Sequence, residues 1–98
     1  MIMDEVKYHI NEYGIIVEDM NIVCMTLAIA IMHHRIRNGF HLTSSRPESI
    51  DDPIAEGATN DLLDSLEKKL DCSFSSIERR EMHLLVSCSR RVNSECLN

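Results

Sequence analysis

The chain has 98 residues, of which 44% are hydrophobic and 27% are charged, and this length predicts a single domain spanning residues 1–98. Sixteen acidic residues against ten basic ones give a net charge of -6, so no electrostatic attraction to the phosphates of nucleic acids is expected. The longest apolar run, Leu27 to Met32, is far shorter than the roughly 20 residues that cross a bilayer, which argues against a membrane segment.

The first predicted element is a short amphipathic helix over residues 3–13, which ends at Gly14. The second predicted helix begins near Glu18 and Asp19 and ends at Asn38, with Gly39 as its C-terminal cap. Its middle, residues 22–32, is apolar on nearly every side. This pattern is typical of a helix with neighbours all round, so we expect it to be the central helix of the fold.

Residues 40–50 contain turn-forming residues and no sustained period, which predicts a surface loop. Asp52 and Pro53 then suit the cap and first position of a third helix, whose apolar stripe is expected at Ile54, Ala58, Leu62, Leu66 and Leu70. Gly57 lies inside this helix and either permits close contact with a neighbour or breaks it.

Ser75 and Glu78 have the spacing of a capping box, which predicts that the last helix begins there and continues to Val92 or beyond. The buried face of this helix is expected to carry Ile77, Leu84, Leu85, Cys88, Val92 and Cys96, with Glu81 on the same side. No segment shows the alternation of a strand, so the predicted fold class is all-α, a compact bundle of four to five helices.

Two of these helices contain a motif with matching spacing. In the second helix, Arg35 follows Ala28 by seven residues and Gly39 follows Arg35 by four. In the last helix, Cys88 follows Glu81 by seven residues. Over about residues 3–97, this arrangement resembles the phosphotransferase-system regulation domain (PRD) of bacterial sugar-responsive antiterminators and transcriptional activators.

The resemblance implies a regulatory, dimerising helical domain. In PRDs, histidines accept phosphoryl groups from phosphotransferase proteins, and the places of those histidines fall on Ala28 and Cys88 here. Packing of the two helices as in the family would bring Arg35 and Glu81 together, either as an ion pair between helices or as the remainder of a phosphate-sensing site. The ion pair is the interpretation we favour, because such pairs are common without function.

Other histidines are the remaining candidates for phosphorylation. His33 and His34 lie about 140 and 240 degrees around the helix from Ala28, and His83 lies about 140 degrees from Cys88, so none takes the place of the family's histidines. We therefore interpret His33, His34 and His83 as ordinary helix residues that are alternative phosphoacceptors only if phosphotransfer occurs. His9 and His41 have the same status.

No cofactor, metal site or catalytic group is predicted. The four cysteines lack the close spacing of zinc ligands and no signal peptide precedes them, which indicates reduced thiols and a cytoplasmic location. An enzyme that depends on a metal or thiol would need His33 or His34 to converge with another histidine or a cysteine. The basic residues Arg79, Arg80, Arg90 and Arg91 are interpreted as a solvated helix face.

The sequence therefore predicts a transcription-regulatory module, not an enzyme, that acts as a homodimer. Its expected partners are phosphotransferase-system proteins or a full-length PRD regulator, with no direct contact to nucleic acid or membrane. The alternative is a small helical protein-interaction domain unrelated to sugar uptake. The sugar, the operon, the partner and the role of Cys88 stay open.

Overall fold

Four helices make up the described part of the chain. The computed structural model describes residues 1–40 and 51–96, with side chains described as far as Ser89. The helices are α1 (Ile2–Glu12), α2 (Asp19–Arg37), α3 (Pro53–Leu70) and α4 (Ser76–Cys96). The described residues contain no strand. The predicted all-α bundle is confirmed. None of the four helices combines the length and apolar character that a membrane span requires.

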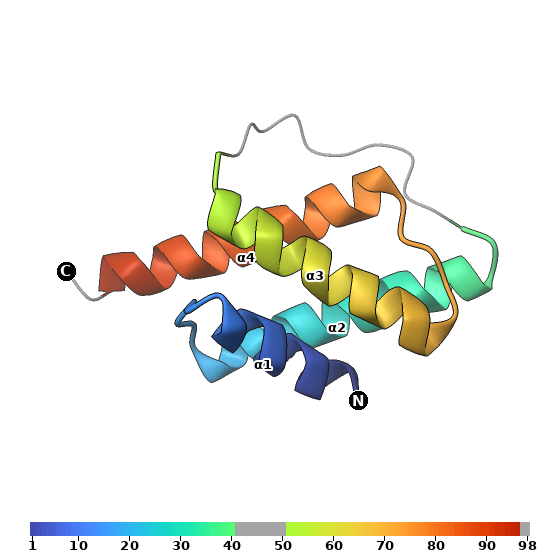
Figure 1. Ribbon diagram of the computed structural model, residues 1–98, viewed down its shortest axis with the longest axis horizontal. Helices are drawn as coiled ribbons and strands as arrows, with labels where there is room; N and C mark the ends of the chain where they lie inside the picture. Colours follow the sequence, from blue (N-terminus) through green and yellow to red (C-terminus); the bar gives the residue numbers. More distant parts are fainter. Residues whose placement is uncertain (41–50, 97–98) are drawn as a thin grey trace.

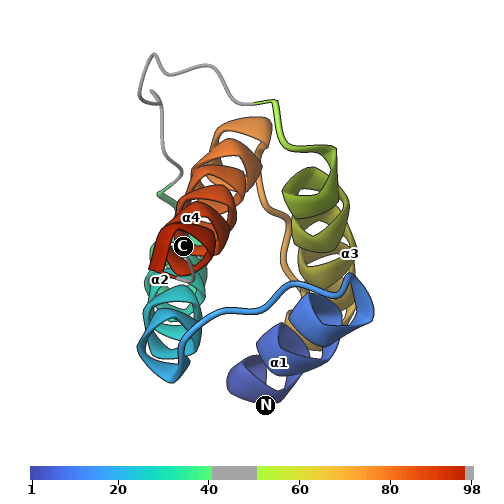
Figure 2. The same cartoon turned by 90° about the vertical axis from the view of Figure 1, so that its left-hand side faces the viewer.

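The helices form a ring around one core. α1 packs against α2 and α3, and α4 packs against the same two helices, so α1 and α4 lie on opposite sides of the core (Figures 1 and 2). The predicted loop over residues 40–50 lies outside the described residues except for Phe40. All four helices contribute buried side chains to the core, which include Val6, Ile10, Met25, Ile29, Met32, Leu62, Leu63, Leu66, Met82 and Val86.

The helix ends form where the sequence predicts them. The Asp52 carboxylate accepts a hydrogen bond from the backbone N–H of Ala55 at 3.2 Å, which caps α3. Ser75 and Glu78 form the predicted capping box, because each side chain accepts a hydrogen bond from the other residue's backbone N–H, at 3.2 and 2.8 Å. Gly39 follows α2 with a positive φ of 82 degrees, which a residue without a side chain adopts easily.

The expectation that α2 is buried on every side is wrong. α2 contacts only α1 and α4, and Figure 2 shows no other helix on its outer side. Ile22, Met25, Ile29 and Met32 face the core. Apolar residues on the outer side, including Leu27 and Ile31, are exposed, because none of the other three helices packs against this side.

The buried faces of α3 and α4 are rotated relative to the predicted ones. Spacing by four residues drifts about 40 degrees per step, so the predicted α3 stripe leaves Ile54 exposed and omits the buried Ala55 and Leu63. On α4, Leu84 is buried as predicted, whereas Ile77, Leu85 and Cys88 are half-buried. The predicted positions Val92 and Cys96, like Arg90 and Arg91, lie beyond the described side chains. The residues of α4 that enter the core are Met82 and Val86.

Gly57 allows the end of α1 to approach α3 closely. A Cβ atom at Gly57 would lie 2.8 Å from Cε2 of Tyr13, which is closer than carbon atoms pack. The ring of Tyr13 therefore rests where a side chain at position 57 would stand, and its hydroxyl donates a hydrogen bond to Asp61. Of the two roles considered for Gly57, close contact is confirmed, because α3 continues unbroken through it.

Candidate functional site

The motif positions lie on neighbouring helices, but the predicted ion pair between them is wrong. Ala28 of α2 is half-buried against the core, and Glu81 and Cys88 of α4 are half-buried. Arg35 is exposed and forms no hydrogen bond or ion pair with any described side chain, Glu81 included. Because Arg35 is near the C-terminal end of α2, it reaches solvent without crossing the core, and it needs no buried partner.

The described histidines that are candidate phosphoacceptors lie on three different helices. His34 is exposed and His33 is half-buried on α2. His83 donates a hydrogen bond from Nε2 to the backbone carbonyl of Asp52 at 3.2 Å, so this ring links α4 to the start of α3. On α1, Nε2 of His9 lies 3.2 Å from Oε2 of Glu5. His41 lies outside the described residues.

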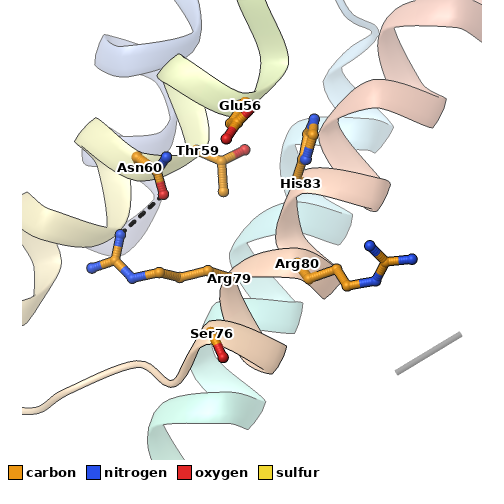
Figure 3. A pocket seen from close by; sticks show the side chains of 7 residues that line it. All are labelled: Glu56, Thr59, Asn60, Ser76, Arg79, Arg80 and His83. Atoms are coloured by element: carbon orange, nitrogen blue, oxygen red, sulfur yellow. Dashed lines mark hydrogen bonds between the residues drawn. The ribbon is translucent and has the colours of Figure 1, made fainter. Parts of the chain in front are cut away.

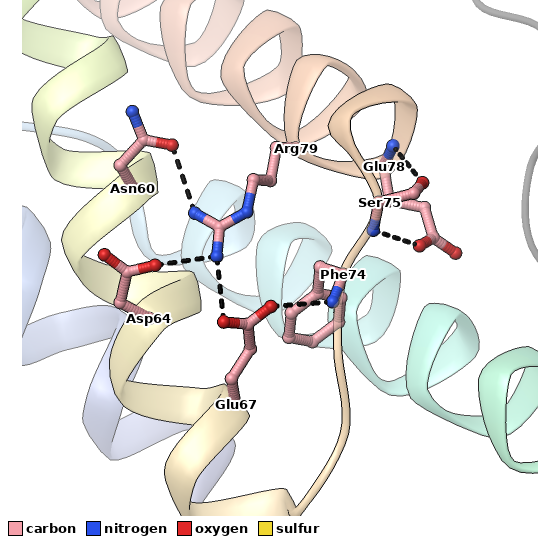
Figure 4. A network of polar contacts seen from close by, with 7 residues as sticks. All are labelled: Asn60, Asp64, Glu67, Phe74, Ser75, Glu78 and Arg79. Atoms are coloured by element: carbon pink, nitrogen blue, oxygen red, sulfur yellow. Dashed lines mark hydrogen bonds and ion pairs between the residues drawn. The ribbon is translucent and has the colours of Figure 1, made fainter.

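Arg79 joins α4 to α3 through the most extensive polar network among the described side chains. Its guanidinium donates to Asn60 at 3.2 Å and to Asp64 at 2.7 Å, and it lies 3.1 Å from Glu67 (Figure 4). Burial opposes the charge of the guanidinium, but the hydrogen bonds with Asp64 and Glu67 outweigh this effect and raise the pKa of Arg79. The second Glu67 oxygen accepts from the backbone N–H of Phe74 at 2.8 Å, which holds the connection between the helices.

A polar cavity of about 390 Å³ opens beside this network between α3 and α4 (Figure 3). Thr59 lines it, and the buried hydroxyl of this residue has no hydrogen-bond partner among the described residues. Two carboxylates already neutralise the Arg79 guanidinium, so a phosphate group entering here would also meet negative charge. The charge of Arg79 is therefore already balanced by protein carboxylates. Its lining residues are Glu56, Thr59, Asn60, Ser76, Arg79, Arg80 and His83.

A second polar cluster joins α1 to α3. Glu5 accepts a hydrogen bond from Ser65 at 3.0 Å and forms an ion pair with Lys69, and His9 is its third partner. The side chain of Glu5 is largely buried, so these contacts offset the cost of removing a carboxylate from water. Opposite charges and hydroxyl donors that satisfy one another in this way indicate a structural role.

The most unusual surface is on the outer side of α2. Four apolar side chains recur there at helical spacing, and we call them the α2 stripe: Met20 is 68% exposed, Val23 37%, Leu27 57% and Ile31 51%. At about 100 degrees per residue they fall within an arc of about 80 degrees, so they form one continuous ridge. Single exposed apolar residues are ordinary, but a ridge of this kind on a small protein is typical of an interaction surface.

The described residues support neither a metal site nor a reactive thiol. Within residues 1–40 and 51–89, no three histidine, cysteine or acidic side chains are grouped so as to hold a metal ion. The described thiols are free, and Cys24 is exposed while Cys72 and Cys88 are half-buried. Burial, followed by the nearby Glu67, raises the pKa of Cys72, which disfavours a reactive thiolate there.

Comparisons with protein-family models, with curated proteins and with solved structures each give no match. The functional interpretation therefore depends on the surface and contacts of this chain. The sequence pattern did not reveal the α2 stripe, because it gave no indication of which sides of α2 would lack a neighbour. The residues of the Arg79 network were also missed, since they are separated along the chain and only the packing of α3 on α4 brings them together.

Proposed function

We propose that this chain is a regulatory interaction module, similar in role to a PRD, that acts by binding another helical domain through the α2 stripe. The observation that carries this proposal is the exposed apolar ridge of Met20, Val23, Leu27 and Ile31. Covering such a ridge removes apolar surface from water, at roughly 25 cal/mol for each Å², which favours association. An effect on transcription in the cytoplasm would then be exerted through the bound partner.

The module is proposed to be insensitive to phosphorylation. The places of the two family histidines are Ala28 and Cys88, and alanine has no atom that accepts a phosphoryl group. The side chain of Arg35 is exposed to solvent, so a preformed pocket for a phosphoryl group is not part of the proposal. The chain would act as a partner that associates with a regulator of similar fold and modulates it without receiving the sugar signal itself.

Two measurements test this function. Purified protein is incubated with phosphoenolpyruvate and the general phosphotransferase proteins, and its intact mass is read at alkaline pH, where phosphohistidine survives. We expect no phosphoryl adduct. Binding to a purified full-length PRD regulator is then measured by fluorescence anisotropy, and we expect binding that Leu27→Asp weakens and that Ile54→Asp, at an exposed position on α3, does not.

The alternative function is a helical interaction domain unrelated to sugar uptake. It is favoured by one observation, the solvent exposure of Arg35, because the PRD resemblance implied that this arginine would face a pocket between the helices. The two functions share the α2 stripe as the binding surface and differ in the partner. Binding to PRD regulators distinguishes them, because an unrelated domain would bind none.

A further inference from the structure

The α2 stripe lies between two ends of opposite charge. Glu18 and Asp19 stand at the start of α2, and Arg35 and Arg37 stand at its end. All four side chains are exposed, and none forms an ion pair or side-chain hydrogen bond with another described residue. Acidic residues at the start of a helix and basic residues at its end stabilise the dipole of that helix on its own. The dipole does not explain the exposed apolar ridge between them.

We infer that the α2 stripe pairs with the same stripe of a second copy of this chain, with the two α2 helices antiparallel. This inference rests on the proposed function, because it names the occupant of the binding surface. A two-fold axis at Leu27 places Leu27 against its equivalent and Val23 against Ile31 of the second copy. Such an interface is self-complementary, as two-fold symmetric interfaces are.

Charge selects the antiparallel arrangement. Asp19 and Arg37 are eighteen residues apart, which is five helical turns, so they lie on the same side of α2 at opposite ends. In an antiparallel pair, Asp19 of each copy lies near Arg37 of the second copy. In a parallel pair, Asp19 would face Asp19 and Arg37 would face Arg37, which is repulsive.

The ends of the interface offer a further complementary pair. Phe40, just beyond α2, is 66% exposed, and hydrogen bonding of its backbone N–H to the carbonyl of Arg35 at 2.8 Å fixes the chain leaving the helix. A cavity of about 260 Å³, lined in part by Ile15 and Ile16, lies where α1 meets α2. The two-fold axis at Leu27 brings Phe40 of one copy level with this cavity in the other. An aromatic side chain inserted there would anchor each end of the dimer.

Sedimentation equilibrium over a range of concentrations tests the pairing. We expect a monomer to dimer equilibrium in which Leu27→Asp raises the dissociation constant on the order of 100-fold, because it buries two facing carboxylates at the symmetry axis. Ile54→Asp is the matched control and should leave the constant unchanged. Circular dichroism verifies that each variant is folded. A wild-type protein that stays monomeric at every concentration overturns the inference.

Charge exchange and cross-linking test whether the two α2 helices of the dimer are antiparallel. Asp19→Arg or Arg37→Asp alone should weaken dimerisation about tenfold, and the double variant should restore it. In a Cys24→Ser background, Leu27→Cys should form a disulfide across the two-fold axis under mild oxidation, whereas Met20→Cys should not. Two Met20 positions would be about 21 Å apart along antiparallel helices, beyond the reach of a disulfide. Cross-linking at both positions indicates a parallel pair and contradicts the inference.

The outcomes also separate this inference from the proposed function. If the protein is monomeric but Leu27→Asp abolishes binding to a PRD regulator, the function stands and the second copy is the wrong occupant. If Leu27→Asp changes neither self-association nor regulator binding, the α2 stripe is not a binding surface and both proposals fail.

Discussion

Asp52 and Ser87 connect the start of α3 to α4 by a buried hydrogen bond, in which the Ser87 hydroxyl donates to the Asp52 carboxylate at 3.0 Å. The other oxygen of the same carboxylate caps α3. We expect Asp52→Ala to lower the free energy of unfolding by about 2 kcal/mol, because it removes the cap and leaves the Ser87 hydroxyl buried without this acceptor. Urea denaturation measures the loss. Asp51→Ala, at the exposed neighbouring position, should cost little, and equal losses for the two variants would refute the role of Asp52.

The Arg79 network should stabilise the packing of α3 on α4. Replacing Arg79 with Met keeps much of its apolar stem but leaves Asp64 and Glu67 facing each other, and we expect a loss of about 1–2 kcal/mol in the free energy of unfolding. Arg79→Lys keeps the charge without the forked donor geometry, so its loss should be intermediate. If Arg79→Met is as stable as wild type in urea, the network contributes nothing to folding.

The contact between Gly57 and Tyr13 predicts that the effect of Gly57→Ala on stability depends on the residue at position 13. Alanine at position 57 favours the helix by about 1 kcal/mol but displaces the Tyr13 ring from its place over α3. We therefore expect Gly57→Ala to be neutral or destabilising in the wild-type protein and stabilising in a Tyr13→Ala background. Thermal unfolding of the wild type, the two single variants and the double variant completes the cycle. Equal effects in both backgrounds would mean that the ring does not rest on Gly57.

The hydrogen bond to Asp61, with lesser contributions from burial and the Asp61 charge, raises the pKa of Tyr13 above its ordinary value. A phenol with a higher pKa in the folded state contributes stability that is complete below the unfolded pKa of about 10 and is lost as the pH rises through the folded pKa. Tyr13→Phe should therefore lose less stability than wild type above about pH 10. Chemical denaturation at neutral and alkaline pH measures the difference, and identical pH profiles would exclude this contribution.

Local signals in the sequence predicted the helix ends well. The Asp52 cap, the capping box of Ser75 and Glu78, and the turn at Gly39 depend on residues close together along the chain, and each forms as predicted. These features require no knowledge of tertiary packing.

Features that depend on neighbours were predicted less well. The apolar composition of α2 suggested complete burial, but a helix at the corner of a four-helix ring has an outer side, and Leu27 and Ile31 lie on it. The stripe on α3 was traced from Ile54 at a spacing of four residues, which drifts away from the true helical period of 3.6. The PRD resemblance predicted an ion pair between Arg35 and Glu81, but Arg35 is exposed and forms no ion pair with a described side chain.

Methyl NMR spectra recorded as the protein concentration is raised, and again after a PRD regulator is added, test most directly whether the α2 stripe is a binding surface. We expect the methyl signals of Met20, Leu27 and Ile31 to shift or broaden in at least the concentration series, while those of Ile54 stay constant. If the signals of the α2 stripe stay constant in both series, association does not use this surface and the proposed function is contradicted.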